Sequence, residues 1–142
     1  MKYHALLAAS VLLSSSTLAL AGADDAATAH FQAIASGELS NIMQDYAGTA
    51  LFQWVGGPLD GSYSGPDAIH GVWKKFTKAN GPMKVSISRL ESSANPKGET
   101  VTANVFFQGN KTVKVRYALT YRDGKIVNEV WQIDPKLMTV YR

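Results

Sequence analysis

A two-residue alternation of apolar and polar positions runs through most of the chain between residues 83 and 133. Every second residue of 101–107 and of 113–121 is apolar, whereas the residues between them are mostly polar. This period is typical of half-buried antiparallel strands, and Gly109-Asn110 and Asp123-Gly124 are two-residue hairpin signals. The pattern predicts a meander of four strands near residues 84–93, 100–108, 111–122 and 125–133.

The first half of the chain has a helical period instead. Apolar residues recur three and four positions apart in 24–36 and again in 39–46. Gly37 and Gly48 follow these segments, and glycine is a common residue just past a helix end. We therefore predict two consecutive helices joined by a short connection.

A strand and a third helix are predicted next. Residues 49–55 are rich in β-forming side chains, and Asp60-Gly61 turns the chain after them. Pro66 is a favoured residue for the first turn of a helix, and apolar residues follow at helical spacing until Asn80-Gly81-Pro82. The order of elements is helix, helix, strand, helix and four strands, which predicts an α+β domain.

The N-terminal residues have the pattern of a secretory signal. Lys2 precedes the apolar run 5–13, and Ala19-Leu20-Ala21 supplies small residues for cleavage after Ala21. The apolar run is shorter than the roughly 20 residues that span a bilayer. We expect an exported protein, periplasmic or secreted, whose mature chain 22–142 forms a single domain without a membrane span.

Composition narrows the chemistry. The chain has no cysteine, which excludes disulfides, thiol catalysis and cysteine-bound zinc. Residues 22–72 hold six carboxylates and no lysine or arginine, whereas 73–142 hold 13 basic and five acidic residues. The basic side chains are dispersed and lack interleaved aromatic residues, so nucleic acid is not an expected partner. Two interpretations fit this uneven distribution of charge: the basic half binds a negatively charged partner, or its basic side chains are simply solvated.

Glu129 is the candidate catalytic residue. The strand period of 125–133 places it on the apolar face with Val127, Trp131 and Ile133. A carboxyl group among apolar residues is costly to bury, and it is suited to general acid or base chemistry or to anchoring a ligand. The alternative is a structural carboxylate paired with Arg116, a lysine or a backbone donor, and a bulge could shift the face.

Aromatic residues recur at positions that could face the same interior. They could form the walls of an apolar ligand site with a few polar tips, or they could be ordinary core. The predicted ligand-binding residues are Phe52, Trp54, Tyr63, Trp73, Tyr117 and Trp131.

No motif indicates a metal or a cofactor. The G-x-S-x-G, Walker, H-E-x-x-H and G-x-G-x-x-G patterns do not occur. His30 and His70 each stand alone on a predicted helix, so we interpret each as a satisfied or solvent-facing side chain.

The order of elements, with the helix break Ser36-Gly37-Glu38-Leu39, the stretch from Gly61 to Pro66 and the hairpin from Asp123 to Ile126, resembles the nuclear transport factor 2-like superfamily. The SnoaL-like branch is the most similar, and the resemblance covers residues 26–134. It implies a cone-shaped domain in which a curved, mixed or antiparallel sheet and three helices from the N-terminal half enclose a pocket. It also implies a possible homodimer through the outer face of the sheet.

Function transfers poorly across this superfamily, which includes isomerases, dehydratases, cyclases and binding domains. Where the isomerases of this superfamily have a tyrosine on the first helix and a base on the first strand, this chain resembles them in position but has Phe31 and Trp54. Other members use an acid on the last strand, and Glu129 is the only residue here that matches it. Three functions therefore stay open. They are a domain that binds a small hydrophobic ligand, a cofactor-independent enzyme that uses Glu129, and an interaction module that docks through Lys114, Arg116 and Arg122.

Overall fold

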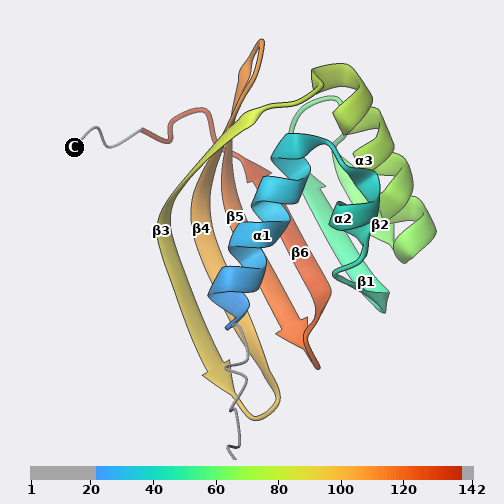
Figure 1. Cartoon of the computed structure of the whole chain (residues 1–142), viewed down its shortest axis with the longest axis vertical. Helices are drawn as coiled ribbons and strands as arrows, with labels where there is room; N and C mark the ends of the chain where they lie inside the picture. The colour runs from blue at the N-terminus through green and yellow to red at the C-terminus, as the bar shows by residue number, and fades with distance from the viewer. Residues whose placement is uncertain (1–21, 139–142) are drawn as a thin grey trace, which may run out of the picture.

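The computed structural model describes residues 22–138, so the predicted signal segment 1–21 and the last residues 139–142 lie outside the described part. Three helices lie on one face of a curved sheet (Figure 1). The helices are α1 (Ala23–Ser36), α2 (Leu39–Met43) and α3 (Pro66–Asn80). The strands are β1 (Tyr46–Val55), β2 (Gly61–Ser64), β3 (Lys84–Asn95), β4 (Gly98–Gln108), β5 (Thr112–Arg122) and β6 (Lys125–Ile133).

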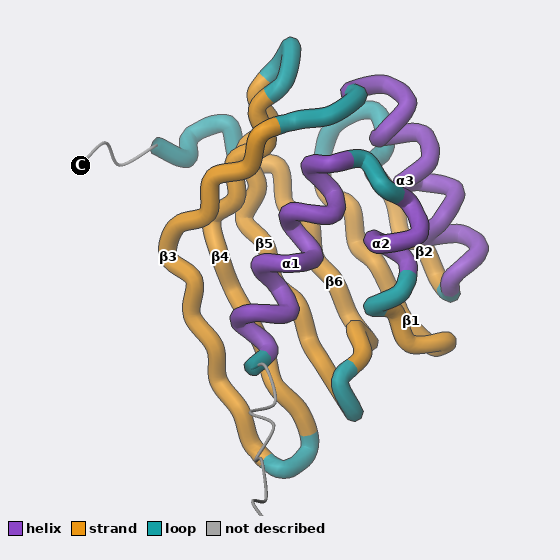
Figure 2. The backbone as a smooth tube through the Cα atoms, in the orientation of Figure 1, coloured by secondary structure: helices purple, strands orange, loops and turns teal. Residues whose placement is uncertain are grey.

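The six strands form one sheet in the order β2-β1-β6-β5-β4-β3. The last strand thus lies in the middle, where β6 pairs antiparallel with β5 and parallel with β1. The other neighbouring pairs are antiparallel, as the predicted meander requires. Figure 2 shows the long strands curving around α1. The predicted α+β architecture, with a mixed sheet and helices from the N-terminal half, is confirmed, and the sheet stays open.

The helix ends follow from local sequence. Asp24 and Asp25 lie in the first turn of α1, where the helix dipole favours negative charge. Gly37 ends this helix with φ of 77° and donates its N–H to the carbonyl groups of the last turn. Pro66 occupies the first turn of α3, as predicted. Among residues 22–138, none of the helices has the length and apolar character needed to cross a membrane.

Two predicted boundaries are wrong. The second helix ends at Met43, and Tyr46 opens β1 instead of continuing the helix toward Gly48. Tyr46 is nevertheless buried in the core from its strand position. The segment after Asp60 is also more than a turn, because Gly61–Ser64 pairs with β1 as strand β2.

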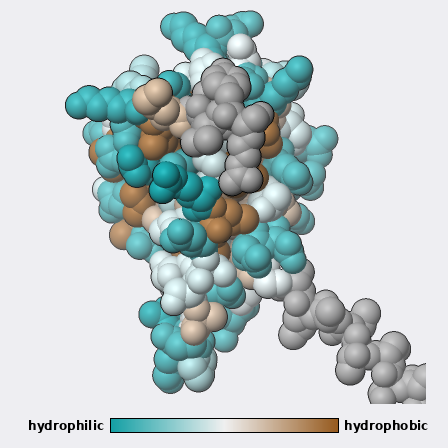
Figure 3. All heavy atoms as spheres, turned by 90° about the vertical axis from the view of Figure 1, so that its left-hand side faces the viewer, coloured by the Kyte–Doolittle hydropathy of each residue, from teal (hydrophilic) through white to brown (hydrophobic). Residues whose placement is uncertain are grey.

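Besides a register shift between Tyr46 and Leu51 in β1, bulges adjust two more strands. A register shift between Thr120 and Tyr121 leaves Ile126 buried and Val127 only half-buried, while Glu129 and Trp131 keep the predicted inward face. A second shift, between Ser88 and Glu91, interrupts the edge strand β3, where Arg89 has φ of 52°. Bulges and polar side chains protect edge strands from pairing with other chains. In the view onto this edge, apolar residues form separate patches among hydrophilic ones (Figure 3).

The core lies between the helices and the inner face of the sheet. Phe106 is the exception on the polar outer face, yet only 2% of it is exposed. Leu137, from the segment that follows β6, is also buried and, like Phe106, does not belong to the main core. Asp134 at the start of this segment accepts a hydrogen bond from Arg116 of the outer face. The segment after β6 therefore provides cover on the outer side of the sheet.

Candidate functional site

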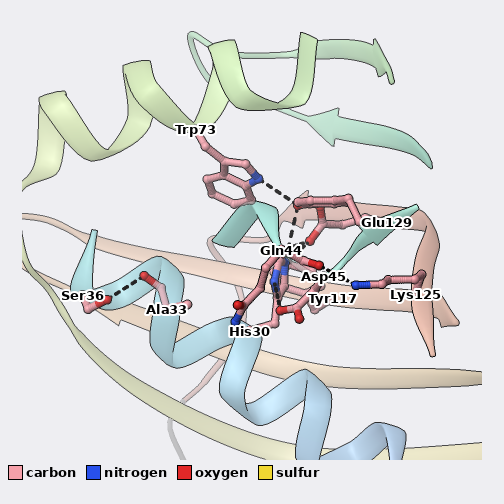
Figure 4. Close-up of polar contacts among 10 residues, drawn as sticks. His30, Ala33, Ser36, Gln44, Asp45, Trp73, Tyr117, Lys125 and Glu129 are labelled. Atoms are coloured by element: carbon pink, nitrogen blue, oxygen red, sulfur yellow. Dashed lines mark hydrogen bonds and ion pairs between the residues drawn. The ribbon is translucent and has the colours of Figure 1, made fainter. Parts of the chain in front are cut away.

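Glu129 lies in the centre of the molecule, on the inner face of β6, and none of its surface is exposed. Its carboxylate accepts hydrogen bonds from three side chains that come from three different elements. His30 of α1 donates from Nε2 over 2.8 Å, Tyr117 of β5 donates over 2.5 Å, and Tyr46 of β1 donates to the other oxygen. Figure 4 shows His30 and Tyr117 beside Glu129. We call Glu129, His30, Tyr46 and Tyr117 the carboxylate cluster.

His30 connects the buried carboxylate to the surface. Its Nε2 faces Glu129, and its Nδ1 lies 3.5 Å from Asp45 Oδ2, an ion-pair distance without the direction of a hydrogen bond. Burial by itself lowers the pKa of His30, but the carboxylates of Glu129 and Asp45 outweigh it and raise this pKa to about 9. His30 is therefore an imidazolium at neutral pH, held between two carboxylates.

The two tyrosines act as O–H donors. Burial, followed by the nearby charge of Glu129, raises the pKa of Tyr46 and of Tyr117 well above the usual value. The Tyr46 hydroxyl also accepts a hydrogen bond of 2.8 Å from the indole N–H of Trp73 on α3. A third tyrosine, Tyr121, has a buried hydroxyl without a hydrogen-bond partner.

Five of the six predicted wall residues lie together in the core. Trp54 stacks on Trp131 with ring centroids 4.4 Å apart, and Phe107 stacks on the other side of Trp131. Trp73 stacks on Phe52 and meets Trp54 and Trp131 edge to face. We call Phe52, Trp54, Trp73, Phe76, Phe107 and Trp131 the aromatic cluster.

Tyr117 belongs to the carboxylate cluster and packs edge to face on Trp131. Tyr63 lies at the edge of the aromatic cluster, with its ring centroid 6.2 Å from that of Phe52. It is half-buried on β2, and its hydroxyl donates to the Leu59 carbonyl. The two clusters thus share one interior, with the polar groups beside the aromatic rings.

This interior is filled by side chains. Of four surface hollows of the described residues, one includes Tyr117 in its lining, and none is lined by Glu129 or by a tryptophan. One of these hollows lies beside α1 and α2 and includes Asp45 in its lining. Glu129 has no exposed surface, so a molecule that reaches it has to displace side chains that cover it.

The partner of Glu129 differs from the predicted alternative. Arg116 lies on the opposite face of the sheet and binds Asp134, so it cannot reach the buried carboxylate. His30, predicted to be a satisfied or solvent-facing side chain, takes that place and is buried. The sequence contains a signal that His30 faces the core, because Ala27 and Ile34 lie three and four residues away on the same buried helix face.

The arrangement can hold and move a proton next to an apolar surface. Glu129 can accept a proton, and His30 carries one that points at Glu129. The tyrosine and indole groups can donate hydrogen bonds to oxygen atoms of a bound molecule.

No family model and no curated protein matches the chain. Several solved structures do. A nuclear transport factor 2-like protein of unknown function from Pseudomonas putida KT2440 has a TM-score of 0.67 at 16% identity. The match covers 83% of this chain and 92% of that chain.

Two further matches have names that suggest enzymes. A candidate dehydratase of the nuclear transport factor 2-like family from Streptomyces avermitilis has a TM-score of 0.65 at 16% identity, over 79% of this chain and 93% of that chain. A candidate polyketide cyclase from Sinorhizobium meliloti has a TM-score of 0.53 at 22% identity, over 76% and 94%. At these identities the similarity is one of fold.

Proposed function

We propose that the protein binds a small, mainly apolar molecule. Its nuclear transport factor 2-like fold and its buried aromatic cluster are together compatible with ligand binding or cyclase-type chemistry. The molecule would lie against the aromatic cluster, with the carboxylate cluster as its polar anchor. Phe52, Trp54, Trp73, Tyr117 and Trp131 would contact it, and Tyr63 would lie at the margin.

One observation carries this proposal. A buried ion pair is rarely the most stable way to fill a core, because apolar side chains of similar volume are often as good or better. Here Glu129 and His30 are both fully buried and are supported by donors from β1 and β5. Stability alone does not account for such an arrangement, whereas a polar anchor for a ligand does.

The first experiment is native mass spectrometry of the protein isolated from its own source, compared with its denatured mass. We expect a reproducible additional mass in the native state. Addition of the released molecule to ligand-free protein should change the tryptophan fluorescence, because all three tryptophans of the chain belong to the aromatic cluster. A ligand that leaves this fluorescence unchanged would contradict binding in the interior.

Matched variants locate the anchor. Glu129→Gln keeps the shape of the side chain and removes its charge, so we expect at least about tenfold weaker binding. Glu91→Gln changes an exposed carboxylate on β3 and should bind like the unaltered protein. Equal weakening in both variants would exclude Glu129 as the anchor.

A second candidate function is a cofactor-independent enzyme of the isomerase, dehydratase or cyclase type. The observation that favours it is the proton-bearing His30 beside Glu129, which together form an acid–base pair. If the bound molecule is a substrate, it should exchange a C–H proton in deuterium oxide or be converted. Glu129→Gln should abolish this change without unfolding the protein, and an unchanged rate would contradict the enzyme proposal.

Two properties of the whole protein are also proposals. We propose export, with cleavage after Ala21, because of the signal pattern in residues 1–21. We also propose that two copies can associate through the outer face of the sheet, around Lys114 and Arg116. The polar outer face of β4 and β5 supports this second proposal.

A further inference from the structure

Asp45 lies between the carboxylate cluster and solvent. The four members of the cluster are between 0% and 8% exposed. Asp45, in the connection between α2 and β1, has a side chain that is 31% exposed and lines the hollow beside α1 and α2. Its Oδ2 lies 3.5 Å from Nδ1 of His30. Asp45 is thus next to both solvent and the buried imidazolium.

The two ring nitrogens of His30 have different surroundings. Nε2 lies 2.8 Å from Glu129 Oε2 and 3.5 Å from the Tyr46 hydroxyl, and both of these residues are buried. Nδ1 has no hydrogen-bond partner among the described residues, and the charge that faces it is the Asp45 carboxylate. A proton at Nδ1 therefore has a partly exposed acceptor, whereas a proton at Nε2 faces the interior.

The other elements around His30 provide no better proton acceptor. Trp73 of α3 contributes a ring without a titratable group. From β5, Tyr117 donates to Glu129, and Tyr121 has an unpaired hydroxyl. Burial, followed by the charges of nearby carboxylates, raises the pKa of both tyrosines well above the usual value, so they keep their protons at neutral pH. Asp45 is the partly exposed carboxylate beside the ring.

The backbone at Asp45 is fixed, whereas its carboxylate is not. The Asp45 carbonyl accepts a hydrogen bond of 2.8 Å from the N–H of Ile126. The neighbouring Gln44 carbonyl accepts one of 2.8 Å from Lys125 Nζ (Figure 4). Within the described part of the chain, the Asp45 carboxylate forms no ion pair besides the one with His30. Rotation of this side chain can therefore shorten the 3.5 Å separation to a hydrogen bond without moving β1.

We propose that Asp45 is the proton gate of the carboxylate cluster, the group through which His30 exchanges its Nδ1 proton with solvent. In the outward step the N–H bond at Nδ1 breaks, its electron pair stays on the nitrogen, and an O–H bond forms at Asp45 Oδ2. Asp45 then gives the proton to a solvent water molecule, and the reverse sequence recharges His30. Asp45 acts through His30, so it is a positioning residue. This inference goes beyond the proposed function and does not depend on a ligand.

Asp45→Asn tests the gate, because the charge of Asp45 and its role as a gate predict opposite changes. Asp45 raises the pKa of His30, so removal of its charge alone would release the proton more readily. Loss of the gate should instead slow the exchange of the Nδ1 proton with water at least about tenfold near neutral pH. Proton–nitrogen NMR with magnetisation transfer from water measures this rate. Exchange as fast as in the unaltered protein, or faster, would overturn the inference.

Two controls use the same hollow. Glu38→Gln removes the other carboxylate that lines it and should leave the exchange rate unchanged. In Asp45→Ala, sodium formate should restore exchange because it supplies a carboxylate in the vacated space, and sodium chloride at equal ionic strength should not. Equal slowing in Glu38→Gln, or equal effects of the two salts, would overturn the inference.

A second measurement needs no variant. In the unaltered protein, the Nδ1 proton of His30 should exchange with water faster than the Nε2 proton of the same ring, because Nε2 faces the buried carboxylate of Glu129. Equal rates, or faster exchange at Nε2, would show that protons leave without Asp45 and would overturn the inference.

Discussion

At the scale of single residues, the burial of Glu129 depends on groups that are far apart in the sequence. His30 provides the opposite charge, and Tyr46 and Tyr117 provide O–H donors. Removal of one partner of a buried ion pair leaves the other charge uncompensated, at a cost of about 3–5 kcal/mol. One carboxylate therefore ties α1, β1 and β5 to β6.

The importance of the ion pair can be measured with two histidine variants. His30→Gln should lower the free energy of unfolding by about 3 kcal/mol, because Glu129 stays buried without its counter-charge. His70→Gln, on the exposed face of α3, should change it by less than about 0.5 kcal/mol. Urea denaturation gives both values, and similar values for the two variants would contradict the role assigned to His30.

The same pair predicts a dependence of stability on pH. The pKa of His30 is about 9 in the folded protein and 6.5 in the unfolded reference, so folding favours the protonated form. The stabilisation, of order 3 kcal/mol, is fully present below pH 6.5 and is lost as the pH rises through about 9.

Thermal unfolding between pH 6 and 10 should show this loss in the unaltered protein and not in His30→Gln. Parallel curves for the two proteins would contradict it. Direct titration of the His30 ring protons by NMR would report the pKa itself.

The residues of the interior were partly predictable. The strand period placed Glu129 and Trp131 inward, and both are buried there. The site roles of these residues stay predictions. The contact between His30 and Glu129 could not be predicted, because it joins residues 99 positions apart and depends on how α1 lies across the sheet.

At the scale of elements, local patterns predicted most of the structure. The four strands of the meander and the helix that begins at Pro66 are confirmed. The parallel pairing of β1 with β6 could not be predicted from either strand, because periodicity defines faces and not neighbours. The short strand β2 was missed because four residues beside a glycine turn carry little periodic signal.

Close contact between strands can be tested at a glycine. A Cβ atom at Gly98 would lie 2.6 Å from the Tyr121 carbonyl oxygen, whereas one at Gly48 would meet no atom within 4 Å. Gly98→Ala should therefore cost about 1–3 kcal/mol, and Gly48→Ala should cost nothing or stabilise β1 slightly. Urea midpoints of the two variants provide the comparison, and equal midpoints would contradict the predicted clash.

At the scale of the whole molecule, the similarity to the nuclear transport factor 2-like fold is confirmed by solved structures. Export is open to a direct measurement. The intact mass of the protein from the exported fraction should correspond to residues 22–142, with Gly22 as the first residue. A full-length protein that stays in the cells would contradict both cleavage and export.

Association of two copies makes a separate prediction. If copies meet through the outer face of the sheet, sedimentation should show dimers that dissociate when Lys114 and Arg116 are both changed to glutamate. Lys74 and Lys75, exposed on α3 at a distance from that face, provide the matched double reversal that should leave dimers intact. If dimers persist after Lys114 and Arg116 are changed to glutamate, the contact between the copies does not lie on the outer face of the sheet.

The central place of β6 in the sheet also has a consequence for biosynthesis. Residues 125–133 leave the ribosome after the other five strands, and β1 has only the short strand β2 as a partner until they arrive. His30 likewise has no Glu129 to bind. A nascent chain that stops before β6 therefore cannot complete its sheet. The domain can therefore complete its fold only after β6 has been synthesised.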